Sequence, residues 1–319
     1  MNYSLLRLRF KSAVHFGESG SALSLYTSED HFTADTLFSA LCHTALSVFG
    51  TEGIERLADY VRNGALLLSD GMPYHGNDLY LPKPMAQSEL RTEVSDAVRK
   101  AMKRLRWIPV AAMDAFTRSL GSGSVFDAER YSVSFGKSDE VTKVQVGASP
   151  YQVGLFRFAP DCGLYFIIGY ADDPLYAEVR KLTALLGLDG IGGKTSSGYG
   201  KFELEDERSF DTPSDSDTEW LSAALRRTEG KALLISSSLP TEEELETALE
   251  GANYQLCRKS GFIYSQTYAE TLRKKKTQYF LNSGSVFVHR YSGALYDVSM
   301  GGSHPVYRYG KAMFVGVDL

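Results

Sequence analysis

The sequence contains little cysteine and no long apolar segment. Its three cysteines, Cys42, Cys162 and Cys257, are isolated and odd in number, which suits a reducing compartment and offers no spacing for a zinc site. No apolar run is long enough to cross a bilayer, and the chain does not open with a basic stretch followed by an apolar one. We therefore expect a cytoplasmic protein with no membrane partner, metal ion or cofactor.

The sequence also lacks an excess of positive charge. Its 34 lysines and arginines are outnumbered by 39 aspartates and glutamates, and the net charge of −5 argues against a protein that coats nucleic acid non-specifically. The charges are nevertheless segregated, because residues 99–106 and 273–276 are basic and residues 203–219 are mainly acidic. This segregation permits a local basic groove, although a charged run is more often a solvated face.

A catalytic pattern is missing as well. No carboxylate pair, metal-ligand cluster or nucleophile with a nearby base stands out, and five histidines have no spacing that suggests a shared site: His31, His43, His75, His289 and His304. His15 differs, because it follows the first predicted strand, where the edge of a sheet meets its loops. There it could act as a general acid or base on a ribose 2′-hydroxyl, contact RNA directly, or be structural.

Glycine is abundant in one place, residues 186–204, which read LGLDGIGGKTSSGYGKFEL. This stretch holds six glycines, one lysine and three hydroxyl residues: Gly187, Gly190, Gly192, Gly193, Gly198, Gly200, Lys194, Thr195, Ser196 and Ser197. Glycines reach positive φ and let a backbone come close to a ligand, so the stretch can present N–H donors to phosphates. The alternative interpretation is a glycine-rich turn that binds nothing.

Two better-known glycine motifs are excluded. A Walker loop ending in Lys194-Thr195 would need a glycine at position 188, where the sequence has Leu188. A dinucleotide fingerprint beginning at Gly190-Ile191-Gly192 would need another glycine shortly afterwards, where the sequence has Lys194 and Thr195. Both motifs also lead from a strand into a helix, whereas this stretch follows a predicted helix and leads into a predicted strand at 199–204.

Hydrophobic periodicity predicts an α+β fold for the first half. The predicted elements are a half-buried strand at 3–10, a helix from the cap Thr33 to Gly50, a hairpin of QVGLFRF and GLYFIIGY within 152–170, a helix from Asp173 to Gly187, and the strand at 199–204. Residues from about 60 to 149 are treated as an insertion that includes a basic helix near 91–105. Without the insertion the order is βαββαβ, the ferredoxin-like (RRM-like) pattern.

The second half reads as a looser copy of the same topology. Residues 211–217, DTPSDSD, resemble a polar linker, and they divide the chain into domains at 1–210 and 218–319. A capping box of Thr241 and Glu244 begins a predicted helix that Gly251 ends. The predicted strands of this half are 231–236, 254–264, 285–291 and 311–317.

Several stretches resemble the RAMP superfamily of CRISPR proteins. GIGGKTSSGYGKFEL at 190–204 is similar to the glycine-rich loop of that superfamily, and HFGESG from His15 and ADTLFSAL from Ala34 to its first loop and first helix. SGSVFVHRYSGALYDV at 283–298 and HPVYRYGKAMFVGVDL at 304–319 resemble the subunit of the type III-A (Csm) interference complex that caps the 5′ end of the guide. The resemblance covers the chain end to end and is weakest between 60 and 149.

The resemblance implies two ferredoxin-like domains and a non-catalytic grip on the repeat-derived 5′ tag of the crRNA in antiviral defence. It also implies contacts with the large polymerase-like signalling subunit, with the adjacent backbone RAMP subunit and, in the assembled complex, with target RNA. The residues expected to bind RNA are His15, Phe16, Gly17, Gly190, Gly192, Gly193, Lys194, Thr195, Ser196, Ser197 and Tyr199. Relatives often carry another basic residue where Ser196 or Ser197 stands, so phosphate affinity would depend on Lys194 and backbone N–H groups.

Within the insertion, residues 85–149 stand where proteins of the superfamily carry a thumb that splays a nucleotide, and the resemblance implies such a thumb here. Its candidate nucleotide-contacting residues are the basic Arg104 and Arg106 and the aromatic Trp107. Two other functions stay open. One is a metal-independent endoribonuclease that processes the crRNA precursor with His15, which the missing catalytic partner disfavours. The other is an assembly protein that touches no RNA, which the basic blocks disfavour.

Overall fold

The structure is a computed structural model that describes residues 1–17, 24–86, 95–122, 124–144, 149–265 and 267–319. Its helices are α1 (Ala34–Phe49), α2 (Thr51–Arg62), α3 (Asp96–Arg104), α4 (Met113–Ser122), α5 (Asp173–Asp189), α6 (Ser216–Arg226) and α7 (Glu242–Leu249), with 3-10 turns η1 (Val110–Ala112) and η2 (Thr195–Ser197). Its strands are β1 (Asn2–Phe10), β2 (Leu66–Leu68), β3 (Met72–His75), β4 (Asp78–Pro82), β5 (Trp107–Pro109), β6 (Gly136–Lys143), β7 (Tyr151–Phe158), β8 (Cys162–Tyr170), β9 (Phe202–Ser209), β10 (Lys231–Leu234), β11 (Leu256–Lys259), β12 (Gln278–Leu281), β13 (Val286–Phe287), β14 (Leu295–Asp297), β15 (Tyr307–Tyr309) and β16 (Phe314–Val317). The α+β class is confirmed, and the described strands pair antiparallel.

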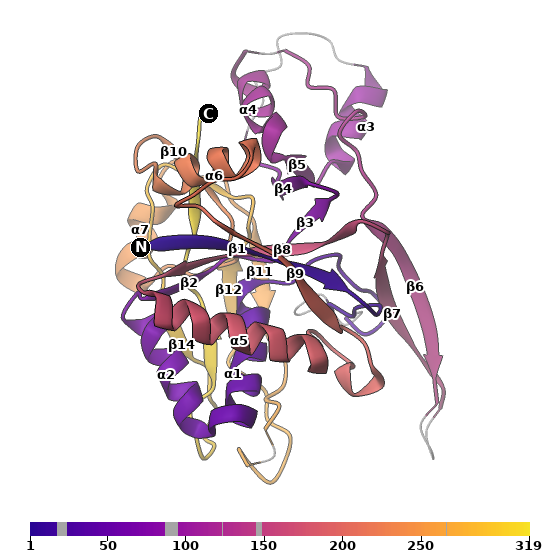
Figure 1. Ribbon diagram of the computed structural model, residues 1–319, viewed down its shortest axis with the longest axis vertical. Helices are drawn as coiled ribbons and strands as arrows, with labels where there is room; N and C mark the ends of the chain where they lie inside the picture. The colour runs from indigo at the N-terminus through magenta and orange to yellow at the C-terminus, as the bar shows by residue number, and fades with distance from the viewer. Residues whose placement is uncertain (18–23, 87–94, 123, 145–148, 266) are drawn as a thin grey trace.

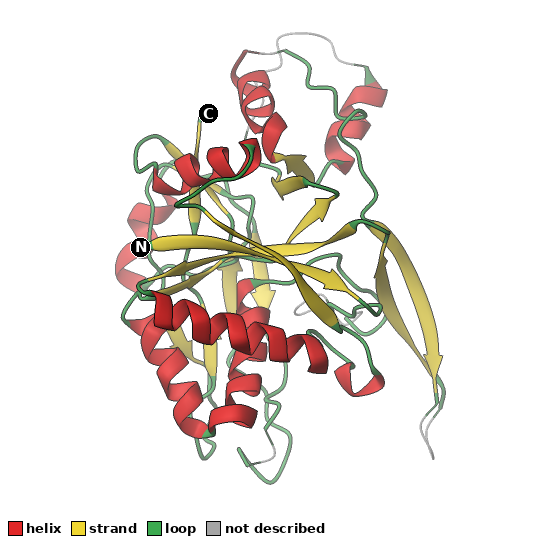
Figure 2. Cartoon of the chain, in the orientation of Figure 1, coloured by secondary structure: helices red, strands yellow, loops and turns green. Residues whose placement is uncertain are grey.

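A seven-stranded sheet organises the first half of the chain (Figures 1 and 2). Its order is β5-β4-β3-β8-β1-β9, and β2 pairs with β8 beyond β3. Leu5 and Leu6 of β1 point to opposite faces, and both are fully buried. The expectation of a half-buried first strand is therefore wrong, because helices cover one face of β1 and the second half of the chain covers the other.

Three helices, α1, α2 and α5, cover one face of this sheet (Figure 1). Helix α1 begins after Thr33 and ends at Gly50 (φ 69°), as predicted. The cap of α5 is Asp172, whose carboxylate accepts a hydrogen bond from Leu175 N, so the expectation that Asp173 caps this helix is wrong by one residue. The predicted stop of α5 at Gly187 is wrong, because the helix runs on to Asp189. Gly187 is instead a helical residue whose missing Cβ leaves room for Phe202 O, 2.4 Å from the ideal Cβ position.

The predicted hairpin of QVGLFRF with GLYFIIGY is also wrong. Strand β7 pairs with β6, and the two form a hairpin that projects from the body of the protein (Figure 1). Strand β8 pairs instead with β1 on one side and with β2 and β3 on the other. Residues 60–149 therefore supply strands of the central sheet and are not wholly an insertion.

The second half of the chain contains a three-stranded sheet of order β13-β10-β16 and two ribbons, β11-β12 and β14-β15. The three-stranded sheet packs on the other face of the central sheet, whereas the β14-β15 ribbon lies against α1 and α2. One hydrophobic cluster joins Leu5 and Ile167 of the first half to Leu233 and Val315 of the second. The two halves consequently share a continuous core.

The predictions for the second half hold in part. The capping box of Thr241 and Glu244 does begin α7, whereas the four predicted strands are shorter in the structure, as β10, β11, β13 and β16. Residues 211–217 are only partly a linker, since Asp215 caps α6 and the buried Asp217 accepts a hydrogen bond from Leu79 N at 3.0 Å. The predicted basic helix is α3; residues 91–94 of that prediction lie outside the described residues.

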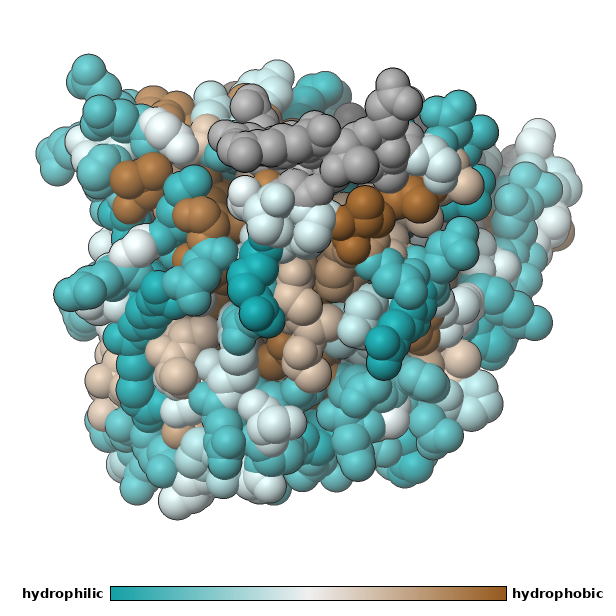
Figure 3. All heavy atoms as spheres, turned by 90° about the horizontal axis from the view of Figure 1, so that it is seen from above, coloured by the Kyte–Doolittle hydropathy of each residue, from teal (hydrophilic) through white to brown (hydrophobic). Residues whose placement is uncertain are grey.

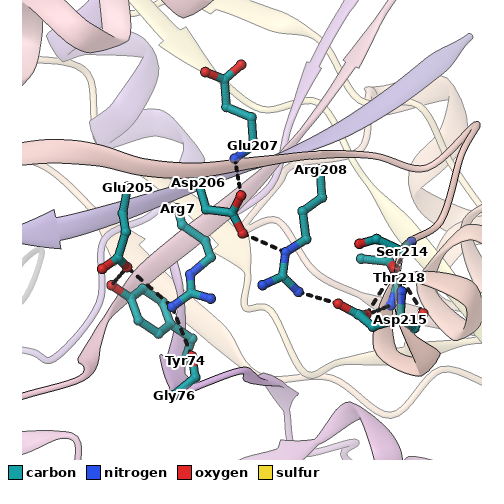
Figure 4. Close-up of polar contacts among 10 residues, drawn as sticks. All are labelled: Arg7, Tyr74, Gly76, Glu205, Asp206, Glu207, Arg208, Ser214, Asp215 and Thr218. Atoms are coloured by element: carbon teal, nitrogen blue, oxygen red, sulfur yellow. Dashed lines mark hydrogen bonds and ion pairs between the residues drawn. The ribbon is translucent and has the colours of Figure 1, made fainter.

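Buried polar contacts fix the sheet at β9 (Figure 4). Arg7 Nη2 donates to Gly76 O at 2.9 Å and lies 3.3 Å from the Glu205 carboxylate, which also accepts the Tyr74 hydroxyl at 2.7 Å. Burial, with the adjacent Glu205, raises the pKa of Tyr74 and keeps it a donor. Nearby, Arg208 bridges the Asp206 and Asp215 carboxylates and so connects β9 to the start of α6.

The outer surface is mainly hydrophilic on the face that Figure 3 shows, where hydrophobic residues form separate groups. Among the described residues, no helix is both long and apolar enough to span a membrane.

Candidate functional site

A cleft of about 750 Å³ opens where the two halves of the chain meet. Four parts of the first half line it: the loop after β1, the N-terminal end of α1, Arg106 just before β5, and the glycine-rich loop. The second half contributes residues 255–260 around β11, together with Lys275 and Arg308. The sequence predicted that the loops of the first half form the site. The fold shows that residues of the second half form the opposite wall of the same cleft.

The glycine-rich loop packs directly on the loop that follows β1. Gly193 N donates to His15 O at 2.8 Å, and Gly200 N donates to Ala13 O at 2.9 Å. A Cβ at Gly192 (φ 98°) would lie 2.7 Å from His15 O, and one at Gly193 would lie 2.6 Å from the His15 ring. These glycines are therefore needed to bring the two loops together, whether or not a ligand is bound.

His15 is a buried residue of the cleft wall. Its Nδ1 lies 2.7 Å from Gly154 O, and a carbonyl can only accept, so Nδ1 carries the proton. Its Nε2 is on the side of Gly17 and Gly193, within 3.5 Å of their ideal Cβ positions. Among the described residues no carboxylate pairs with this imidazole.

Phe16 and Gly17 complete this wall. The Phe16 ring is buried and packs edge-on against Phe10 and Phe32, with centroids 6.2 and 5.7 Å away. It therefore holds the loop in place and offers no free face to a base. Gly17 is exposed at the rim, where a Cβ would lie 2.6 Å from Ser24 O.

The other residues expected to bind RNA do not line the cleft. Gly190 is buried under the loop, where its ideal Cβ lies 2.5 Å from Tyr199 O. Lys194 has a left-handed backbone (φ 61°), and its ammonium lies 5.1 Å from the centre of the Tyr151 ring. Thr195, Ser196 and Ser197 form the turn η2 on the outer side of the loop, and the Tyr199 ring lies 5.0 Å from Lys143 Nζ. This outer group is adjacent to the β6–β7 hairpin.

The cleft is positively charged although the protein is acidic. Five cationic side chains line it, against two carboxylates, Glu29 and Asp35: Arg106, Arg258, Lys259, Lys275 and Arg308. Each of the two basic blocks of the sequence contributes one of these cations, Arg106 and Lys275. The remaining three come from segments with no distinctive sequence pattern, and only the fold shows that they belong to the site.

The base of the cleft lies at the N-terminal end of α1. Lys259 Nζ donates to Thr33 Oγ1 at 2.9 Å. The Arg308 side chain is buried, and its Nη1 donates to Lys259 O and Lys276 O at 3.1 and 3.0 Å. Burial lowers the pKa of Arg308 and of Lys275, while the Asp35 carboxylate opposes this effect. The cations at the base are thus held in a partly desolvated position.

Glu29, Asp30 and His31 offer the one group of potential metal ligands among the described residues. Arg106 already lies 2.9 Å from Glu29 and 3.4 Å from Asp30. Although burial disfavours its charged form, hydrogen bonding to His31 and the charges of His31 and Arg106 lower the pKa of Asp30. The negative charge of Glu29 and Asp30 is therefore already balanced by the Arg106 guanidinium.

The structure does not support Trp107 as an exposed aromatic tip. Trp107 lies in β5 and is buried, and Arg106 is engaged by Glu29. Residues 87–94, 123 and 145–148 of the predicted thumb lie outside the described residues. In this region α3, α4 and β6, which pairs with β7, all stand away from the central sheet (Figure 1).

The sequence of this chain is similar to those of known CRISPR proteins. The family model for the CRISPR Csm4 C-terminal domain matches residues 227–317. The chain is 34% identical over 323 residues to the CRISPR system Cms protein Csm4 of Mycobacterium tuberculosis (strain CDC 1551 / Oshkosh), covering 99% of this chain and 98% of the relative.

Two solved structures have a similar fold. One is a chain of the Csm3-Csm4 subcomplex in the type III-A CRISPR-Cas interference complex, with a TM-score of 0.68, 17% identity and 100% of both chains covered. The other is a chain of the Csm1-Csm4 cassette in complex with pppApA, with a TM-score of 0.61, 18% identity, and 100% of this chain and 99% of that chain covered. The structural likeness shows the fold, and the full-length relative shows the family. The chain belongs to the Csm4 family of CRISPR proteins.

Proposed function

We propose that this chain is a non-catalytic RNA-binding subunit of a type III-A CRISPR Csm complex and that it holds the 5′ tag of the crRNA in the cleft. The observation that carries the proposal is a cleft with five cations and two carboxylates in a protein of net charge −5. Phosphates supply most of the affinity of a protein for RNA, so a local excess of cations is the expected electrostatic footprint.

The first-half wall suits the sugar–phosphate backbone of a single strand. His15 Nε2 can accept a hydrogen bond from a ribose 2′-hydroxyl, because Nδ1 holds the proton. Gly17 and Gly192 are exposed, so their backbone is accessible to the strand, although the missing Cβ of each faces the protein's own backbone at Ser24 O and His15 O. Gly193 acts mainly by keeping the two loops together, since its N–H is already bonded to His15 O.

We assign the outer side of the glycine-rich loop to RNA that extends beyond the cleft. Lys194 would be its charged contact, with the hydroxyls of Thr195, Ser196 and Ser197 as donors and Tyr199 beside them. Lys194 and Thr195 are partly exposed, and Ser196 and Ser197 are exposed, so all four are accessible to a strand. Gly190 would act indirectly, by shaping the turn that presents this group.

The fold and partner assignments extend this proposal. The order β9-β1-β8-β2 with α1 and α5 on one face supports a ferredoxin-like first domain, and we propose a reduced second copy in residues 218–319. The similar chains were solved in Csm3-Csm4 and Csm1-Csm4 assemblies. We propose by analogy that this chain bridges the large polymerase-like subunit and the adjacent backbone subunit near target RNA, in the cytoplasm.

The competing function is an endoribonuclease that processes the crRNA precursor with His15. Glu29 and His31 line the same cleft, but Glu29 is paired with Arg106 and His31 is bonded to Asp30, and neither contacts His15 among the described residues. A histidine without a catalytic partner is a poor fit to a reaction that needs both a proton acceptor and a proton donor. Incubation of the protein with repeat RNA, with and without divalent metal, separates the two functions. Cleavage that disappears in His15→Ala would establish the nuclease and remove the non-catalytic proposal.

The tag-binding proposal predicts how two loop variants behave. A hydrogen bond to a charged group is worth about 1.5–3 kcal/mol, so Lys194→Ala should weaken tag-RNA binding roughly ten- to a hundredfold. It should also reduce the salt slope by about 0.7, because one phosphate contact is lost. Gly193→Val should weaken binding at least as much, because its side chain would collide with His15.

The measurement is tag-RNA affinity across a salt series for the wild type and both variants, with circular dichroism to show that each is folded. Lys201→Ala is the matched control, because Lys201 is an exposed lysine just beyond the same loop. Three coincident salt curves for the wild type, Lys194→Ala and Gly193→Val would show that the loop is only a turn.

A further inference from the structure

The base of the cleft holds more positive charge than the protein itself neutralises. Lys259, Lys275 and Arg308 gather there, and the only carboxylate lining this part of the cleft, among the described residues, is Asp35. Arg308 Nε lies 3.7 Å from Asp35 Oδ2, which is an ion-pair distance but not a hydrogen bond. Two formal positive charges therefore remain without a protein counter-charge.

Several donors at this place have no acceptor within the described residues. Arg308 is 2% exposed, and its Nε makes no hydrogen bond. The Lys275 ammonium makes neither a hydrogen bond nor an ion pair there, although the Lys275 backbone N–H is bonded to Gly261 O. In α1, Ala34 N is bonded to Asp70, but the N–H groups of Asp35 and Thr36 find no acceptor in the described part of the chain.

This arrangement is unfavourable for the folded protein alone. Partly buried like charges repel one another, and desolvated donors lose hydrogen bonds to water that nothing replaces. An anion at this point would meet the positive end of the sixteen-residue helix α1 together with the unpaired cations. A site that is destabilised without its ligand is a common signature of a binding site.

We propose that Lys259, Lys275, Arg308 and the first turn of α1 form a seat for a single phosphate group, which we call the phosphate seat. The inference rests on the proposed function, in that the phosphate would belong to the single-stranded RNA in the cleft. It adds a second-half contact that anchors one position of the strand. The other walls of the cleft then contact the sugars and neighbouring phosphates.

Lys275→Met is the informative variant, and Lys274→Met is its matched control. Lys274 is adjacent in sequence and exposed, and its ammonium lies 5.7 Å from the centre of the Phe262 ring outside the cleft. Lys275→Met should weaken tag-RNA binding about tenfold or more, since a charged contact is lost. The same variant should unfold at an equal or higher urea concentration than the wild type, because an uncompensated charge has been removed.

Modified RNAs, combined with the Lys275→Met variant, identify the phosphate that the seat takes. Tag RNAs that each carry one neutral methylphosphonate linkage are measured against the wild type and Lys275→Met. One linkage should weaken binding to the wild type about tenfold and have no further effect in Lys275→Met, which is the pattern of a direct contact. Comparison of 5′-hydroxyl with 5′-phosphorylated RNA shows whether the seat takes an internal or a terminal phosphate.

The outcomes separate this inference from the proposed function. Tag RNA that binds the wild type, Lys275→Met and Lys274→Met equally would overturn the phosphate seat and leave the proposed function standing. If tag RNA does not bind the wild type, the proposed function fails. In that case the phosphate seat is tested with inorganic phosphate. A higher melting temperature of the wild type, but not of Lys275→Met, would support the seat, and no such effect would contradict it.

Discussion

Asp70 is one of the residues that connect the two walls of the cleft. It is fully buried between β2 and β3, and its carboxylate accepts hydrogen bonds from Ala34 N at 2.8 Å, Ser237 N at 2.9 Å and Ser237 Oγ at 2.8 Å. One side chain thus holds the start of α1 against the segment that follows β10. The hydrogen bonds of Asp70 therefore help to fix the relative positions of the two segments at the base of the cleft.

Asp70→Ala should therefore destabilise the protein by about 3–5 kcal/mol, because it leaves buried donors unpaired. Urea unfolding of the full chain measures this change. Asp161→Asn is the control, since Asp161 is exposed with φ 59°, a conformation that asparagine tolerates. An Asp70→Ala protein as stable as the control would mean that the two halves are held together by other contacts.

The sequence identified part of the site at this scale. Five of the predicted residues line the cleft, because one of their loops follows the end of β1 and the other precedes the start of the neighbouring antiparallel strand β9: His15, Phe16, Gly17, Gly192 and Gly193. Lys259 and Arg308 were not foreseen, since they lie in short strands with only two cations, Arg258 and Lys259, in β11 and one in β15. These residues reach the cleft only because segments far apart in the sequence pack together, and hydrophobic periodicity does not predict such packing.

Helix α5 and strand β9 present the glycine-rich loop between them, so their mutual packing matters for the site. Arg180 of α5 donates through Nε to Glu207 of β9 at 2.6 and 2.7 Å, and the Tyr176 hydroxyl donates to the same carboxylate at 3.0 Å. The hydrogen bond from Arg180 holds the pKa of Glu207 below its usual value.

Because the pKa of Glu207 is lower in the folded state, the pair stabilises the protein above the unfolded-state pKa and loses this effect as the pH falls through the folded-state pKa. Glu207→Gln should lower stability at pH 7 by less than about 1 kcal/mol, since both side chains are partly exposed. The difference from the wild type should shrink in acid. Urea unfolding at pH 7 and pH 3.5 tests this, with the exposed Asp189→Asn as control; a difference that grows in acid would contradict the assignment.

Periodicity predicted most elements better than it predicted their partners. α1, α7 and the central strands β1 and β8 were anticipated because each has a strong pattern or cap. The hairpin of β7 with β8 was wrong, because adjacent strands usually pair but here the chain uses β2 and β3 instead. β2 has only three residues, and β3 and β4 contain proline, so their patterns are too short to recognise.

At the scale of the whole molecule, the first and second halves act as one unit. They share a hydrophobic cluster, and the Tyr309 hydroxyl accepts a hydrogen bond from Leu68 N at 2.7 Å across the boundary. The acidic residues gather on β9 and around α6, while the cations line the cleft. The cleft is therefore a product of both halves, and neither half alone would carry its charge.

The most direct test is to map where the tag lies in the assembled complex. crRNA with a photoreactive nucleotide in the 5′ tag is crosslinked, and the crosslinked peptides of this chain are identified by mass spectrometry. We predict crosslinks to both walls of the cleft, near residues 13–17 or 192–193 and near residues 255–260 or 273–276. Crosslinks confined to one half of the chain, or found only on other subunits, would contradict it.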